Sequence, residues 1–340
     1  MLLVLAACLI WPRHGMAGGE VCVVQIPEHL LERPFAGPGV DVLKTTYAFT
    51  NGKAVPVYAR PAGAEQGEMP VRFLPEGYIG LSLERPEPVM AKGEPWYQIN
   101  QGEYVRAVEL ALAEPSRHQG VLVPHFFDKT FAWVLFNSRV SKGPGEAPEE
   151  DALFLPERAL VFVHELREVD GEKWCDIGCG WWLPYRRLGL VIRQPRPPGV
   201  GEREQWIDVS LNEQTLAAYE GDRLVFATLI SGGESNFPTV EGLFQIYFKA
   251  AKRKMSGGED VGAYYYLEDV PWQMYFHEGF ALHASYWHDF LGLPNSHGCV
   301  NLSPKDAKWI FEWSIPRFKA GQSQAGTTRK NPGSWVWIHE

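Results

Sequence analysis

The stretch from Phe280 to Ser303, FALHASYWHDFLGLPNSHGCVNLS, constrains this chain more than any other. It places one cysteine, Cys299, directly after a His-Gly pair and downstream of a second histidine, His283. A nucleophilic cysteine needs a base, a backbone that presents the sulfur, and N–H donors that stabilise an oxyanion. Gly298 supplies the backbone freedom because it has no Cβ. Either His283 or His297 can supply the base.

The run after Cys299, VNLSPKDAKWIFEW, predicts the start of a helix. Ser303 suits the N-cap, Pro304 the first helical position and Asp306 the third. A thiolate just before a helix N-terminus is stabilised by the helix dipole. We therefore expect the pKa of Cys299 to fall below the ordinary thiol value of about 8.5.

These residues resemble the catalytic motif of the L,D-transpeptidases, the YkuD-type family. That motif is a histidine, a loop, Ser/Thr-His-Gly-Cys, a hydrophobic residue, and Asn or Arg. Here it reads His283, a loop, and then SHGCVN from Ser296 to Asn301. The segment from Trp206 to Tyr247 carries further family elements, namely a Ser-Gly-Gly turn and the positions Pro238, Thr239, Gly242 and Phe244. The resemblance covers about residues 203–340.

The resemblance implies a role for each residue of the motif. Cys299 is the nucleophile and His283 the general base, its ring oriented by the backbone carbonyl of Ala284 or Ser285. Asp289 is therefore not expected to act as a triad member. The backbone N–H groups of His297, Gly298 and Cys299 are expected to form the oxyanion hole, and Ser296 and Asn301 to hold the loop.

Further residues are candidates for the substrate cleft. His277 lies on the face of His283 if the strand is unbroken, and Tyr275 and Trp287 are near in sequence; for all three a packed or solvated position is the alternative. Four histidines occur between residues 277 and 297, yet HEGFALH lacks HExxH spacing, so neither a metal nor another cofactor is expected. A basic cluster either meets substrate carboxylates or lies in a solvated loop: Lys249, Lys252, Arg253 and Lys254.

Composition indicates a turn-rich, mainly β protein of about two domains. The chain has 340 residues, 45% of them hydrophobic, with 34 glycines, 26 prolines, 13 Trp, 13 Tyr and 18 Phe. Its net charge of −9 gives no electrostatic basis for binding nucleic acid.

A weak internal repeat organises the first 200 residues. GEPWYQINQGEYVRAVEL from Gly93 aligns without gaps on GEKWCDIGCGWWLPYRRL from Gly171, and both copies resemble bacterial SH3-like repeats. We expect Trp96 and Trp174 to point inward. The predicted organisation is two small SH3-like β-barrels and a YkuD-like β-sandwich with a short helix after the cysteine. Its segments are 40–112 (repeat 1), 113–152 (connection), 153–192 (repeat 2), 193–204 (Pro-rich semi-rigid spacer) and 205–340 (catalytic domain).

The cysteines and the N-terminal segment indicate the compartment in which the protein acts. Of five cysteines, Cys175 and Cys179 either form a local disulfide or stay reduced, and Cys299 is expected to be free. Residues 1–20 have the apolar core of an export signal, and the sequence before Cys8 fits a lipobox. We therefore expect a protein of the cell envelope or the exterior, with membrane anchoring through Cys8 as an alternative.

The function that the resemblance implies is a secreted peptidoglycan L,D-transpeptidase of cell-wall biogenesis and cell shape. It would form 3→3 cross-links between stem peptides through a Cys299 thioester. Two alternatives stay open: an L,D-carboxypeptidase that uses water as the acceptor, and a non-catalytic cell-wall-binding protein.

Overall fold

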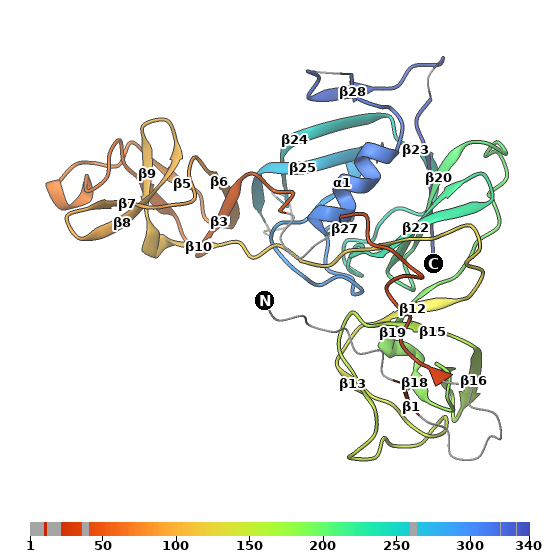
Figure 1. The fold of residues 1–340 in the computed structure, drawn as a ribbon. Coiled ribbons are helices and arrows are strands. Elements are labelled where there is room, and N and C mark those ends of the chain that lie inside the picture. The colour runs from red at the N-terminus through yellow and green to blue at the C-terminus, as the bar shows by residue number, and fades with distance from the viewer. Residues whose placement is uncertain (1–9, 12–21, 36–40, 259–263, 320, 331) are drawn as a thin grey trace.

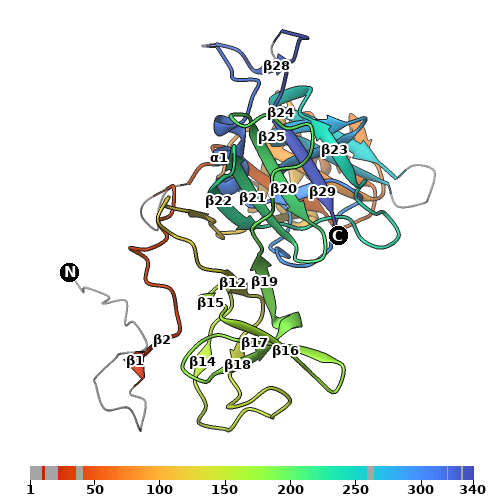
Figure 2. The same ribbon diagram turned by 90° about the vertical axis from the view of Figure 1, so that its right-hand side faces the viewer.

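The computed structural model describes residues 10–11, 22–35, 41–258, 264–319, 321–330 and 332–340. The fold is mainly β, as expected, and the described part contains one α-helix. Figures 1 and 2 show three bodies: a central two-sheet body and two smaller β modules attached to it at different places. The leader-like residues 1–9 and 12–20, including Cys8, lie outside the described residues. No described helix has the length and hydropathy that a membrane crossing requires.

One sheet of the central body has six strands in the order β11-β22-β21-β20-β29-β23. Its strands are Val121–Leu122 (β11), Gln205–Ser210 (β20), Thr215–Glu220 (β21), Arg223–Leu229 (β22), Gly242–Gln245 (β23) and Trp335–His339 (β29). The last described strand, β29, pairs parallel with β20 and antiparallel with β23, so it lies inside the sheet next to the β20–β21 hairpin.

The second sheet has eight strands and is shared between the central body and the first module. Its main path is β10-β3-β6-β25-β24-β28, with β26 paired to β25 and β27 paired to β26. The strands of the central body are Phe248–Gly257 (β24), Tyr265–His277 (β25), Phe280–Ala284 (β26), Val300–Leu302 (β27) and Gln324–Gly326 (β28). Those of the first module are Thr46–Thr50 (β3), Tyr78–Leu83 (β6) and Leu110–Leu112 (β10).

The main core lies where the two sheets meet the helix Pro304–Trp313 (α1). Phe226 of one sheet, Met274 of the other and Ile310 of the helix are fully buried in the same cluster. The helix begins as predicted: the Ser303 side chain accepts a hydrogen bond from the Asp306 N–H, and proline occupies the first turn. This core fixes β26 and its parallel partner β27, at the end of which the site described below lies.

The first module is built from β3, β6, β10 and five further strands. These are Val55–Val57 (β4), Arg72–Leu74 (β5), Val89–Ala91 (β7), Glu94–Asn100 (β8) and Glu103–Arg106 (β9), with 3-10 turns at Ala64–Gln66 (η1) and Ala107–Glu109 (η2). The pairings are β10-β3-β6, β4-β5 and β7-β8-β9.

The second module has the same succession of elements. It comprises Phe131–Val134 (β12), Ser138–Arg139 (β13), Phe154–Leu155 (β14), Leu160–Phe162 (β15), Glu165–Val169 (β16), Glu172–Asp176 (β17), Trp182–Pro184 (β18), Tyr185–Arg187 (η3) and Leu188–Val191 (β19). The pairings β19-β12-β15, β13-β14 and β16-β17-β18 repeat those of the first module strand for strand. Gly93 and Gly171, aligned by sequence, both have positive φ at the same hairpin turn. Trp96 and Trp174 are buried, as expected.

The predicted boundaries of the second copy are wrong. It begins at Phe131, inside the segment 113–152 that we expected to be a connection, because Phe131–Val134 forms its fully buried central strand. The repeat was recognisable in sequence only at the β16–β18 hairpins, where the turn glycines recur. The earlier strands share topology without sharing residues. The SH3-like assignment of both copies stays a prediction.

The segment 193–204 is not an exposed spacer. Val200 is buried in the core on the outer face of the six-stranded sheet. Arg193 donates to the Phe127 carbonyl, and Arg196 pairs with Asp222 at 3.0 Å. Segment 193–204 is therefore packed along the central body, and its prolines keep the backbone extended there.

The local disulfide between Cys175 and Cys179 is excluded. Cys179 is disulfide-bonded, whereas Cys175 is a free, buried thiol on β17. Burial raises the pKa of Cys175 to about 12, so it is an inert core residue. Two short strands precede the modules, Ile10–Trp11 (β1) and Cys22–Val23 (β2), and pair with each other.

Candidate active site

A cavity of about 740 Å³ lies at the end of β26 and β27 and contains both Cys299 and His283. We call it the site cavity. Its walls come from the β24–β25 hairpin, the loop between β26 and β27, and the first module. The lining residues are Gly52, Glu76, Gly77, Tyr78, Glu234, Met255, Tyr264, Tyr265, Leu267, His283, Trp287, His288, Phe290, Asn295, Ser296, His297, Cys299 and Asn301.

Cys299 is half-buried and immediately precedes β27. Gly298 has a φ of +112°, and a Cβ there would lie 2.6 Å from the Phe280 ring, so only glycine fits this turn. The buried Ser296 hydroxyl accepts from the Gly298 N–H at 3.0 Å and donates to the Cys299 carbonyl at 2.5 Å. Ser296 therefore holds the loop, as expected.

The expected oxyanion hole needs one correction. The Gly298 N–H is already bound to the Ser296 hydroxyl, so in this conformation it does not point at a substrate. Of the three backbone donors that we expected, those of His297 and Cys299 are left for the role. A further backbone N–H, that of Ala281, hydrogen-bonds to the Cys299 sulfur and favours its ionised form.

His283 lies on β26 and is buried. Its Nδ1 is 3.1 Å from the carbonyl oxygen of Ala284, one of the two partners expected. A ring that donates Nδ1–H to a carbonyl carries its lone pair on Nε2, the atom that can accept a proton. Burial lowers the pKa of His283 to about 4, although the bond to Ala284 opposes this. The ring is therefore neutral at pH 7 and competent as a base.

The pKa of Cys299 is raised rather than lowered. Burial lifts it to about 11, against the opposing bond from Ala281. Our expectation from the helix dipole is wrong because strand β27 separates the cysteine from α1, and the dipole acts only near the first turn. The resting pair is thus a thiol and a neutral imidazole.

His288, which the sequence did not single out, links this loop to β27. Its Nδ1 accepts from the Phe290 N–H at 3.1 Å, so its Nε2 carries the proton. Nε2 lies 2.9 Å from the side-chain amide of buried Asn301, whose oxygen is otherwise unpaired. Because Nε2–H and the amide NH2 are both donors, this contact is a hydrogen bond when the amide oxygen faces Nε2. Asn301 on β27 thus lies against His288 of the loop that precedes it.

Residues 204–338 match the family model of the L,D-transpeptidase catalytic domain, YkuD. This part of the chain is a YkuD-type L,D-transpeptidase domain. YciB of Bacillus subtilis (strain 168), whose name assigns it to the L,D-transpeptidases, is 30% identical over 132 residues, which are 35% of this chain and 65% of that protein. The chain thus spans just under two thirds of its curated relative.

Two solved structures are also similar. A mutant of the Enterococcus faecium L,D-transpeptidase matches with 22% identity, covering 40% of this chain and 50% of that one, at a TM-score of 0.32. An L,D-transpeptidase from Mycobacterium smegmatis matches with 17% identity, covering 67% of this chain and 92% of that one, at a TM-score of 0.34.

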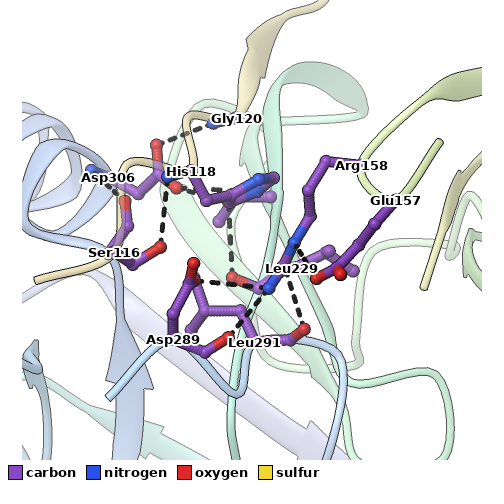
Figure 3. Close-up of polar contacts among 11 residues, drawn as sticks. Ser116, His118, Gly120, Glu157, Arg158, Leu229, Asp289, Leu291 and Asp306 are labelled. Carbon is purple, nitrogen blue, oxygen red and sulfur yellow. Dashed lines mark hydrogen bonds and ion pairs between the residues drawn. The ribbon is translucent and has the colours of Figure 1, made fainter. Parts of the chain in front are cut away.

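Asp289 is not part of the site of this L,D-transpeptidase domain. Its carboxylate lies 3.3 Å from Arg158 of the second module, and it does not contact His283. Arg158 also donates to the carbonyls of Asp289 at 2.9 Å and Leu291 at 2.8 Å (Figure 3). The second module therefore holds the loop that follows His283.

Of the three candidate cleft residues, the site cavity includes one. Trp287 lines it, whereas Tyr275 and His277 do not. The strand is not continuous from His277 to His283, because β25 ends at His277 and a turn leads into β26. The Tyr275 hydroxyl instead donates to Gln273 at 2.7 Å. His297 is exposed at the rim, with its ring 4.5 Å from that of Phe237.

The basic cluster lies on β24, away from the site cavity. Lys249 is buried and donates to the carbonyls of Phe311 and Ser314, so it caps the C-terminal end of α1. Burial lowers its pKa to about 7. Lys252 pairs with Asp269 at 3.6 Å. Within the described residues, no group of three His, Cys, Asp or Glu is placed to hold a metal ion.

Proposed function

We propose that this protein is a peptidoglycan L,D-transpeptidase that forms 3→3 cross-links through a thioester on Cys299. The observation that carries the proposal is that Cys299 and a neutral, buried His283 line one cavity. The Ala284 carbonyl holds the histidine with Nε2 as its basic atom. These are the parts that thiol acyl transfer requires.

The first half-reaction acylates the enzyme. The Cys299 sulfur attacks the carbonyl carbon of the third residue of a tetrapeptide stem while His283 accepts the thiol proton. The bond to the terminal D-alanine breaks, its nitrogen takes the proton from His283, and a thioester is left. The backbone N–H groups of His297 and Cys299 are the donors for the oxyanion.

The second half-reaction transfers the acyl group. An amine of a second stem attacks the thioester carbon and passes a proton to His283. The carbon–sulfur bond breaks as the amide forms, and the sulfur regains its proton from His283. If water attacks instead, the enzyme is an L,D-carboxypeptidase.

We further propose that the protein acts outside the cytoplasm, on the cell wall. The apolar segment near the N-terminus supports export, as does the disulfide of Cys179, because structural disulfides persist mainly in oxidising compartments. Anchoring through Cys8 is the alternative to release.

Incubation of the full chain with purified tetrapeptide stems, read by mass spectrometry, tests the proposal. A cross-linked dimer with loss of D-alanine is expected. Tripeptide alone would show a carboxypeptidase, and unchanged stems with binding to sacculi would show a wall-binding protein. Cys299→Ala is expected to abolish all products, whereas Cys175→Ala, which removes the other free thiol of the described residues, is expected to retain them. Turnover by Cys299→Ala would refute the nucleophile assignment.

A further inference from the structure

The first module forms one wall of the site cavity. Gly52, Glu76, Gly77 and Tyr78 all line it, although they precede Cys299 by more than 200 positions. The contact is made by strand pairing, with β6 parallel to β25 and Tyr78 opposite Tyr265. Figure 1 shows the module's β3 and β6 continuing the sheet that contains β25.

The position of this wall is fixed by close backbone contacts. The Tyr78 N–H donates to the Tyr264 carbonyl at 3.1 Å. Gly77 has a φ of +123°, and a Cβ there would lie 2.6 Å from the same carbonyl oxygen. Only glycine permits this approach. The carboxylate of Glu76 is thus carried on a backbone held against the site.

Buried aromatic and polar contacts reinforce the attachment. The rings of Tyr47 in the module and Tyr286 after His283 stack with centroids 3.7 Å apart. The Tyr47 hydroxyl donates to the Asp269 carbonyl at 3.0 Å, and Glu268 accepts from the Ser82 N–H at 3.0 Å. The module is therefore a fixed part of the site.

The charges on the cavity lining have one sign. Glu76 and Glu234 are its carboxylates, both are exposed, and no Lys or Arg lines the cavity in the part of the chain that the structure describes. Among the described residues, neither carboxylate has a hydrogen-bonding or ionic partner. Glu234 lies beside the nucleophile loop, since its N–H donates to the Ser296 carbonyl at 2.9 Å. Burial keeps the phenols of Tyr78 and Tyr265 neutral, with pKa values of about 12. A cavity of this kind favours a cationic ligand.

We propose that Glu76 of the first module and Glu234 of the L,D-transpeptidase domain bind the ammonium group of the acceptor amine. The inference rests on the proposed function and adds to it a binding site for the second substrate. The two carboxylates bind the ammonium, and one of them accepts its proton and releases it to solvent. The neutral nitrogen then attacks the thioester and passes a second proton to His283. The Cys299 sulfur takes that proton as the carbon–sulfur bond breaks.

Binding of a cationic probe to the full chain tests this without any chemistry. Cadaverine is the probe, 1-pentanol is its neutral control, and chemical shifts of the protein report binding. We expect Glu76→Gln and Glu234→Gln each to weaken cadaverine binding about fivefold, as for one partly exposed charge pair. Glu87→Gln, an exposed charge of the same module outside the cavity, is expected to change nothing. Equal binding in all variants would overturn the proposal.

Turnover separates this inference from the proposed function. With tetrapeptide stems as donor, we expect the two variants to raise KM for cadaverine as acceptor and to leave KM for neutral hydroxylamine unchanged. An equal effect on both acceptors would overturn the role in acceptor binding. If the wild type binds cadaverine as expected but releases no D-alanine, the proposed function fails while the cation site stands. If it cross-links stems and both variants match it with every acceptor, only the cation site fails.

Discussion

The two small modules share one topology but are attached to the central body in different ways. The first module adds its β3, β6 and β10 to the edge of a sheet through the pairing of β6 with β25. The second module packs against the face of the other sheet, where its Phe131 and Trp133 share a core with Trp206, Ala217 and Leu229. In Figure 2 the second module lies below the central body.

This difference separates two uses of the same fold. Edge pairing depends on backbone hydrogen bonds and a few close contacts, and it places a loop of the module in the site cavity. Face packing removes apolar surface from water, which is the larger source of stability. We infer that the second module mainly stabilises the L,D-transpeptidase domain, whereas the first mainly shapes its site.

The largest expected effect is that of Trp133→Ala. Trp133 is buried in the shared core, and replacing a buried tryptophan by alanine costs about 3–5 kcal/mol of the free energy of unfolding. The loss of stability should extend to the L,D-transpeptidase domain, because the space left by the missing Trp133 ring lies against the face of its six-stranded sheet. Denaturant unfolding with hydrogen exchange at β20–β22 measures it.

Trp96→Ala in the first module is the matched control. Trp96 is equally buried but lies within its own module, against Tyr58. Faster exchange is expected in β8 and β9, with β20–β22 still protected. If both variants raise hydrogen exchange at β20–β22 equally, the two modules do not differ in how they stabilise the central body, contrary to our inference.

The second prediction concerns the segment between the modules, which is tied to α1 (Figure 3). The buried Asp306 carboxylate accepts from the Gly120 N–H at 2.8 Å and the Thr228 hydroxyl at 2.6 Å, and His118 lies 3.1 Å from that hydroxyl. Burial raises the pKa of Asp306 to about 6. The folded state therefore holds this proton more tightly than the unfolded state, so the contribution of Asp306 to stability is fully present below about pH 4 and is lost as pH rises through 6.

Asp306→Asn reproduces the neutral carboxyl and is the variant that isolates this effect. Relative to the wild type, it should gain up to about 3 kcal/mol in free energy of unfolding between pH 4 and pH 7. Unfolding curves at several pH values for both proteins give the difference. A difference that does not change with pH would show that Asp306 is ionised throughout.

The third prediction concerns Gly77→Ala. Positive φ and the carbonyl of Tyr264 at 2.6 Å oppose a Cβ there, at a cost of about 1–3 kcal/mol. We expect a modest loss of stability but a larger loss of acceptor use, because the wall that carries Glu76 shifts. Gly67→Ala is the control, since Gly67 also has positive φ but nothing within 4 Å. Similar kinetics for the two variants would contradict the role of the wall.

The sequence was sufficient to predict the glycine turn before Cys299 and the helix that follows it. Ser303, Pro304 and Asp306 act locally, as does the glycine turn before Cys299, so short-range rules apply to them. The carbonyl partner of His283 is also local, at Ala284. The ionisation of the pair was not predictable in the same way, because burial depends on residues far away in the chain.

What the sequence missed depends on long-range pairing. Nothing in the residues around Glu76 indicates that β6 will pair with β25. The sequence pattern of each segment predicts a half-buried strand but not its partner. Likewise His288 carries no motif, and its role follows from the position of Asn301 on β27. The turn glycines Gly93 and Gly171 revealed the repeat, but the attachment of each copy depends on tertiary contacts.

The smallest expected effect comes from the polar contacts between Arg158 of the second module and the loop after His283. Arg158 donates to the carbonyls of Leu291 and Asp289, and a lysine cannot make both bonds at once. Arg158→Lys should therefore cost about 1 kcal/mol and lower kcat a few-fold, because the loop that carries Trp287 and His288 loosens. Hydrogen exchange at residues 288–293 should rise with it.

Asp289→Ala keeps both carbonyl contacts, so its effect on kcat should stay within about 0.5 kcal/mol. Arg139→Lys, which disturbs a bond to Ala152 inside the module, should leave kcat unchanged. If Asp289→Ala proves the most damaging of the three, the carboxylate rather than the Ala284 carbonyl orients His283, and the second module contributes to the site through a charge as the first does.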